Sequence, residues 1–203
     1  MSGSGFWGGA AAPAAHGPAA APIGNLEVVH EYADGPMPTG VSVSASGRIF
    51  VNFPKWGDDV PATVVELRDG GAVPYPDEAW NTADGVADRD ALVSVQSIVV
   101  DPADRLWILD TGSPMFAPTE VGGPKLVGVD LATDRVFAVI VLPREVALPT
   151  TYLNDVRFDL RRGEGGVAYI TDSADSGPNG IIVVDLASGQ SWRRLHEHSP
   201  PRR

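Results

Sequence analysis

Short runs in which apolar and polar residues alternate recur along the chain from about Leu26 onward. The clearest group lies within residues 152–192, where runs at 156–160, 167–171 and 181–186 are followed by a fourth after Gln190. Turns rich in Gly, Ser, Pro and Asn separate these runs. Alternation with a period of two is typical of half-buried strands, and four such strands joined by short turns predict an antiparallel meander. No window carries apolar residues at helical spacing over three turns, so we predict a nearly all-β chain.

The same order of runs and turns occurs twice more upstream, so the chain contains a repeat. Corresponding residues of successive units are Arg48 and Arg105 (57 apart), Asp110 and Asp172 (62 apart), and Leu67, Leu131 and Leu186 (64 and 55 apart). Four-stranded units of this length are typical of β-propeller blades, each of which must stack on its neighbours to cover both faces. We therefore predict three four-stranded blades, over about residues 36–80, 91–145 and 150–196.

Composition narrows the classes of partner. The chain has 203 residues, 43% of them hydrophobic, which is enough for one sizeable domain or two small ones. A net charge of −11 argues against nucleic acid and anionic membrane surfaces as partners and suits a cationic ligand. The absence of cysteine excludes disulfides, thiolate metal sites and cysteine nucleophiles. No apolar run approaches the roughly 18 residues that a membrane-spanning helix needs.

The two ends differ in composition from the repeat. Residues 1–24 are rich in Gly, Ala and Pro and contain no Lys or Arg, whereas a signal peptide needs a basic region before an apolar core. We predict a disordered leader over residues 1–24, with a degraded export signal as the alternative, a partial propeller over 25–199 and a tail over 200–203. These features leave a cytoplasmic location open.

Candidate ligand-binding residues lie on the first strand of two blades. In a propeller the innermost strands line a central channel, and ligands bind at its mouth. Aligning the repeats places Gln96 opposite Asn154 and Ser97 opposite Asp155. Polar residues at equivalent positions of two blades predict a ligand or metal site formed by Asn154, Asp155 and Gln96. The alternative is that these side chains only cap the start of a strand.

Three further residues have both a binding and a structural interpretation. Asp110 and Asp172 end the second strands of successive blades. Their recurrence favours a bond to the backbone of the next blade, and the alternative is a carboxylate that faces the channel and binds a cationic amine. Trp56 follows Pro54 and Lys55 in a loop, where it either stacks on an aromatic ligand or packs against the loop itself.

Common catalytic motifs are absent from the sequence. The four histidines do not form H-E-x-x-H, and neither a G-x-S-x-G elbow nor a phosphate-binding P-loop occurs. We therefore predict no metal site and no cofactor from motifs.

Several ordered motifs resemble a known family. They are the runs 47–56 (GRIFVNFPKW), 94–97 (SVQS), 104–112 (DRLWILDTG), 152–155 (YLND), 168–173 (AYITDS) and 180–192 (GIIVVDLASGQSW). Together these motifs are similar to the Yellow / major royal jelly protein family, whose bacterial relatives are described as L-dopachrome tautomerase-related proteins. The resemblance covers about residues 26–199. It implies a six-bladed propeller of roughly twice this length, so that the three blades counted here would form an incomplete ring, an N-terminal half.

Three functions are considered, and the resemblance implies the first two. The first is a dopachrome-converting tautomerase in which Asp155 or Asp172 acts as the base and Asn154 as a hydrogen-bond donor. The second is a non-catalytic module that binds a small cationic aromatic amine through Asn154, Gln96, Asp110 and Trp56, or an inactive truncated fragment. The third borrows from a neighbouring class of six-bladed propellers, the calcium-dependent lactonases, and would need calcium as a cofactor. Secretion is implied by the family, and exposed blade faces would permit self-association.

Overall fold

The computed structural model describes residues 24–82 and 89–196. The chain divides into two units, residues 1–31 and 32–203, and every strand described belongs to the second. The predicted tail, and all of the predicted leader except Gly24, lie outside the described residues.

The second unit contains three sheets of four strands each. The first sheet consists of β1 (Gly40–Val43), β2 (Ile49–Asn52), β3 (Val64–Arg68) and β4 (Gly71–Pro74). The second consists of β5 (Val95–Val100), β6 (Arg105–Asp110), β7 (Lys125–Asp130) and β8 (Arg135–Val141). The third consists of β9 (Leu153–Asp159), β10 (Val167–Asp172), β11 (Gly180–Asp185) and β12 (Ser191–Arg194). The other described elements are a short helix, α1 (Glu78–Asn81), and a 3-10 turn, η1 (Pro114–Phe116).

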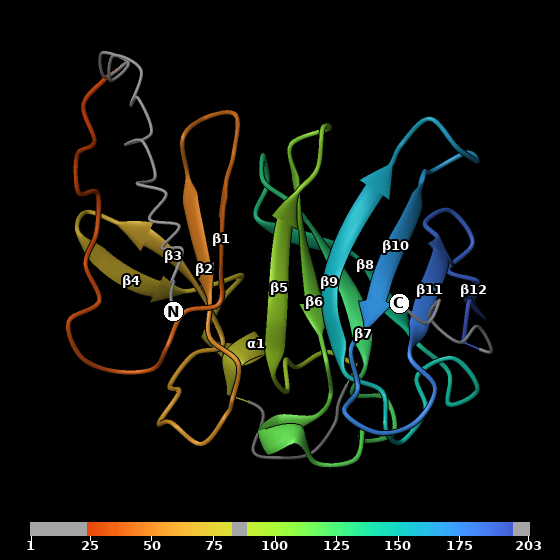
Figure 1. Ribbon diagram of the computed structural model, residues 1–203. Coiled ribbons are helices and arrows are strands. Elements are labelled where there is room, and N and C mark those ends of the chain that lie inside the picture. The colour runs from red at the N-terminus through yellow and green to blue at the C-terminus, as the bar shows by residue number, and fades with distance from the viewer. Residues whose placement is uncertain (1–23, 83–88, 197–203) are drawn as a thin grey trace, which may run out of the picture. The chain divides into compact units, whose positions relative to one another are not determined.

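Each sheet is an antiparallel meander in which strands pair in chain order. The turns show why: between β3 and β4, Asp69 and Gly70 both have positive φ (51° and 80°), as two-residue hairpin turns require. The first strands lie side by side, with β5 between β1 and β9 (Figure 1). This arrangement confirms the predicted propeller-type fold with three four-stranded blades. Within the described residues these blades do not close into a ring.

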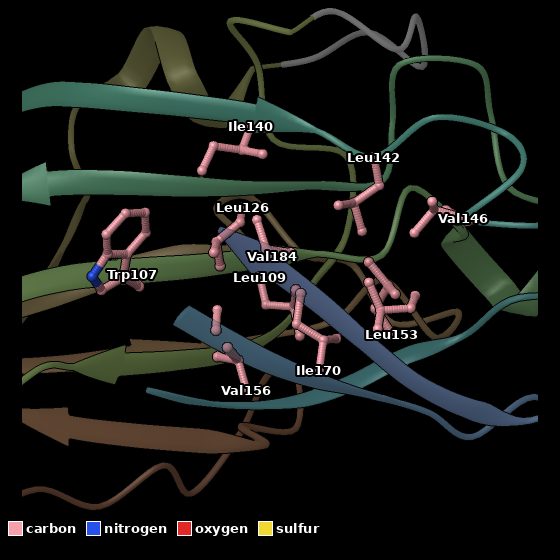
Figure 2. Close-up of a cluster of buried hydrophobic side chains, with 13 residues drawn as sticks. Trp107, Leu109, Leu126, Ile140, Leu142, Val146, Leu153, Val156, Ile170 and Val184 are labelled. Carbon is pink, nitrogen blue, oxygen red and sulfur yellow. The ribbon is translucent and has the colours of Figure 1, made fainter. Parts of the chain in front are cut away.

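Apolar side chains from facing blades fill the space between neighbouring sheets. Between the second and third blades, Trp107 and Leu126 pack with Val156, Ile170 and Val184 in one buried cluster (Figure 2). A second cluster joins the first and second blades and includes Phe50, Val64, Ile98, Leu106 and Val127. Because alternate residues of a strand point to opposite faces, the period-two pattern provides an apolar surface for each neighbour. Trp107 is therefore a core residue.

A polar network joins the first two blades at the end where β1 and β5 finish. Arg48 donates to both oxygens of Glu66 (2.7 and 2.8 Å), to the carbonyl oxygen of Leu131 (2.8 Å) and to Asp134 (2.7 Å). Burial alone would raise the pKa of the Glu66 carboxyl, but hydrogen bonds from Arg48 and Arg68 outweigh burial and hold the pKa below its ordinary value. Glu66 therefore remains charged within this network.

Candidate functional site

The inner strands β5 and β9 each contain a β-bulge near the end at which they begin, which we call the mouth. The register shift on β5 leaves Gln96 as an extra residue. The shift on β9 sets Asn154 and Asp155 opposite a single residue of β10. A bulge changes the direction in which side chains point, and bulges are frequent next to active sites. The two bulges thus take the polar side chains of Gln96, Asn154 and Asp155 out of the regular alternation with core positions.

The first blade has no such bulge. Strand β1 pairs one-to-one with β2 over its whole length, from Gly40 to Val43. Val41 is 65% exposed. The polar site therefore belongs to the second and third blades.

Direct hydrogen bonds connect the two bulges. Gln96 Nε2 donates to Asn154 Oδ1 over 3.4 Å, and Ser97 Oγ donates to Asp155 Oδ1 over 3.1 Å. The structure thus brings together the residues that the aligned repeats placed opposite one another. Asp155 also accepts from Arg157 Nη1 over 2.6 Å.

Three aromatic rings meet beside the bulges, and we call Trp56, Phe116 and Tyr152 the aromatic cluster. Phe116 stacks on Trp56 with ring centroids 5.6 Å apart and lies 4.9 Å from the Tyr152 ring. Trp56 Nε1 donates to the Tyr152 hydroxyl over 2.7 Å, and that hydroxyl donates to Gln96 Oε1 over 2.9 Å. A continuous hydrogen-bonded chain thus runs from Trp56 through Tyr152 and Gln96 to Asn154.

The loop that carries Phe116 has an unusual backbone conformation. Met115 and Phe116 both adopt left-handed φ values (52° and 57°), although neither is glycine. Each such residue costs on the order of 1 kcal/mol and is retained only where surrounding contacts hold it. The Met115 amide donates to the Lys55 carbonyl over 2.7 Å, which ties this loop to the loop of Trp56. Strain of this kind is frequent at ligand sites.

Two cavities adjoin these residues. The mouth pocket, of about 440 Å³, is lined by the aromatic cluster and by residues 113, 117–118, 149–151 and 173–176. The strand groove, of about 550 Å³, is lined by residues 39–42, 96–99, 154, 155 and 157. Gln96 and Asn154 line both. Of the described residues that line the mouth pocket, Asp175 is the one with a carboxylate.

The Tyr152 hydroxyl is a proton donor under ordinary conditions. Burial raises the pKa of the Tyr152 phenol, and the opposing hydrogen bond from Trp56 does not cancel this effect. The phenol therefore stays protonated and keeps its hydrogen bond to Gln96.

Asp110, by contrast, is buried in a structural role. Its carboxylate accepts hydrogen bonds from the amides of Val93 (2.7 Å), Ser94 (2.9 Å) and Gly112 (3.0 Å). Lys125 Nζ lies 2.9 Å from the same group, and both side chains of this ion pair are fully buried. These partners fix the segment that leads into β5.

Asp172 repeats the arrangement in the third blade. It accepts from the Tyr152 amide (3.0 Å), from Thr151 Oγ1 (2.8 Å) and from Arg193 Nη2 (2.8 Å). We expected such carboxylates to bond to the backbone of the next blade, and that expectation was wrong. Each binds the start of the inner strand in its own blade, because the second strand ends directly beside that start.

The residues that the structure describes contain neither a metal-binding group nor a membrane-spanning helix. No group of three or more His, Asp or Glu side chains in residues 24–82 and 89–196 could hold a metal ion. No helix in the same ranges is long and apolar enough to cross a membrane.

Sequence inspection missed Tyr152, Phe116, Asp175 and Arg157 as site residues. Tyr152 gave one signal, since it directly precedes the polar pair of the third inner strand. Phe116 and Asp175 lie in loops without regular spacing, so the repeat did not identify them. Trp56 was named as a candidate, and it is half-buried in the wall of the mouth pocket.

The fold and site define a propeller-type repeat protein with a polar and aromatic pocket where its inner strands begin. The family model for major royal jelly protein matches residues 93–202. Protein yellow of Drosophila erecta is 31% identical over 167 residues, and protein yellow of Drosophila melanogaster is 30% identical over the same length. The chain belongs to the Yellow / major royal jelly protein family.

The matched region is a limited part of these relatives. The alignments cover 77% of this chain but only 30% of each of the two yellow proteins. Among solved structures, the Dos1 propeller is 11% identical with a TM-score of 0.44, over 79% of this chain and 49% of that one.

Proposed function

We propose that the protein binds a small aromatic amine in the mouth pocket. The observation that carries this proposal is the aromatic cluster at the wall of a pocket that also contains Asp175 and the hydrogen-bonded chain to Asn154. Small-molecule sites typically combine apolar walls with a few polar groups, in cavities of roughly 300–1,000 Å³.

Each part of such a ligand has a matching group in the pocket. Phe116 exposes 60% of its surface, so a ligand ring can pack against it; an aromatic pair contributes roughly 0.5–1.5 kcal/mol beyond the area buried. A ligand ammonium would be attracted by the ring faces and by the Asp175 carboxylate. The net charge of −11 further favours the approach of cations.

Titration calorimetry with tyramine, and with butylamine as a control that lacks the ring, tests this proposal. We expect heat of binding with tyramine and a much weaker signal with butylamine. Trp56→Leu should weaken tyramine binding about tenfold, because it removes one ring of the cluster. The matched variant Trp192→Leu changes a tryptophan on β12 that does not line the pocket and should bind as the wild type does. Equal signals from the two amines, or none, would contradict the proposal.

A second candidate is conversion of dopachrome, the activity that family membership suggests. The observation that favours it is the position of Asp155 beside Asn154: a carboxylate with an accessible oxygen can act as a general base, and the amide can stabilise developing charge. Asp172 does not enter this proposal, because Arg193 and the start of β9 already occupy its carboxylate. Wild type should remove dopachrome absorbance faster than Asp155→Asn; equal rates would contradict this candidate.

Two further suggestions rest on resemblance, one to the family and one to a neighbouring class of propellers. Secretion of the protein is one of them, and measuring the protein in the medium against the cell fraction of its natural host tests it. Calcium-dependent lactone hydrolysis is the other and remains a prediction.

A further inference from the structure

The carboxylate of Asp155 is only half used by the protein. Ser97 Oγ (3.1 Å), the Val156 amide (2.8 Å) and Arg157 Nη1 (2.6 Å) all donate to Oδ1. Among the described residues none donates to Oδ2, and the side chain is 41% exposed in the strand groove. An oxygen of this kind can accept hydrogen bonds from a bound ammonium group.

The guanidinium of Arg157 is half used in a complementary way. Its hydrogen bonds, to Asp155 and to the carbonyl oxygen of Val156 (2.7 Å), both come from Nη1. The edge formed by Nε and Nη2 has no partner in the described part of the chain, and the side chain is 70% exposed. Two parallel N–H groups on one edge match the two oxygens of a carboxylate.

These two open groups lie next to each other on β9, and we infer that the ligand is zwitterionic: an aromatic α-amino acid rather than a simple amine. This inference rests on the proposed function and names the class of its ligand. In this assignment Asp155, in place of Asp175, binds the ammonium group, Arg157 binds the carboxylate, and the aromatic cluster binds the ring.

The charges of Asp155 and Arg157 explain why the site would prefer a zwitterion. A simple amine that approaches Asp155 also meets the like charge of Arg157, and a simple acid that approaches Arg157 meets Asp155. A zwitterion presents both signs to the pair and is repelled by neither. The paired side chains thus select against ligands that carry only one charge.

The two cavities allow one ligand to reach both groups. The strand groove holds Asp155 and Arg157, the mouth pocket holds the aromatic cluster, and Gln96 and Asn154 line both. The oxygen of the Asn154 amide is occupied by Gln96, so its nitrogen remains a donor for the ligand carboxylate.

Three ligands with the same ring test the inference: tyrosine, tyramine, which lacks the carboxylate, and 3-(4-hydroxyphenyl)propionate, which lacks the ammonium. Titration calorimetry should show tyrosine binding about tenfold more tightly than either, the gain expected from one additional charge-assisted pair. Arg157→Gln should weaken tyrosine about tenfold and leave tyramine unchanged or slightly tighter. Arg157→Lys should recover part of the tyrosine affinity, because it restores the charge without the planar edge.

The matched control is Arg161→Gln, which removes an arginine that is 89% exposed and paired with Asp159 on a turn outside both cavities. It should bind all three ligands as the wild type does. Thermal melts of the variants exclude misfolding. Tyramine binding as tightly as tyrosine to the wild type, or Arg157→Gln keeping full tyrosine affinity, would overturn the zwitterion assignment and leave the proposed function intact. Failure of all three ligands to bind would overturn both.

Discussion

Asp172 and Asp155 lie on adjacent strands of the third blade, but the protein uses their carboxylates in opposite ways. Asp172 is 5% exposed, and its two oxygens accept hydrogen bonds from the start of β9 and from Arg193. Asp155 is partly exposed and is bonded through one oxygen alone among the described residues. A buried charge is tolerated only when its partners are complete, whereas an exposed one can be left half satisfied. Complete partners therefore identify a structural carboxylate, and an open oxygen beside a cavity identifies a candidate for binding.

The difference arises from the local course of the backbone. Asp172 ends a regular strand and lies directly beside the start of its neighbour, so backbone amides surround it. Asp155 sits within a bulge, where the strand turns side chains out of the usual alternation. Asp110 occupies in the second blade the place that Asp172 has in the third. It is buried in the same way and also has a cation partner, Lys125.

Removing a structural carboxylate should have the largest effect. Asp110→Ala leaves Lys125 buried without its partner, and breaking a buried ion pair in this way costs about 3–5 kcal/mol. Urea unfolding at pH 7 should show this loss in the free energy of unfolding. Asp155→Asn is the matched control and should change stability by less than about 1 kcal/mol, because its ion pair with Arg157 is exposed. Similar losses in the two variants would contradict the division between structural and binding carboxylates.

Lowering the pH should reduce the free energy of unfolding by an intermediate amount, through carboxylates whose pKa is held down by their partners in the folded protein. The pKa of Glu66 is lower in the folded protein than in the unfolded chain, so its contribution to stability is complete above the unfolded pKa and is lost as pH falls through the folded pKa. The pKa of Asp134, which is held down by Arg48 and Tyr75 against the opposing effect of burial, has the same direction. Urea unfolding from pH 7 to pH 3 should show falling stability, with a flatter profile for Glu66→Gln. If the stability of the variant fell as steeply with pH as that of the wild type, Glu66 would be excluded as a source of the pH dependence.

The fold was predictable because its determinants are local and repeated. Alternating runs specify strands, and the spacing of Asp110 and Asp172 specifies blades, so both could be read without knowledge of contacts. The same recurrence favoured a structural role for these two residues. Their partners were not predictable, since these depend on which strand ends lie side by side.

The site was predictable only in part, for a physical reason. Gln96 and Asn154 occupy equivalent places in two repeats, so alignment alone could bring them together. The aromatic cluster takes Trp56 from the first blade, Phe116 from a loop of the second and Tyr152 from the start of the third. No spacing links these three residues, and only the stacking of blades makes them neighbours.

The smallest expected effect concerns the one oxygen of Asp155 that the protein does use. Ser97 donates to Oδ1 from the neighbouring blade, and a partly exposed hydrogen bond of this kind contributes about 0.5–1.5 kcal/mol. A double-mutant cycle of Ser97→Ala and Asp155→Ala, measured by urea unfolding, should give a coupling energy near the lower end of that range. Asp155→Ala with Ser46→Ala is the control cycle; Ser46 bonds to Ser44 in another blade and should give no coupling. If Ser97 and Asp155 proved uncoupled as well, the hydrogen bond to Oδ1 would not connect the two blades, and Oδ1 would be held only by Val156 and Arg157 of its own strand.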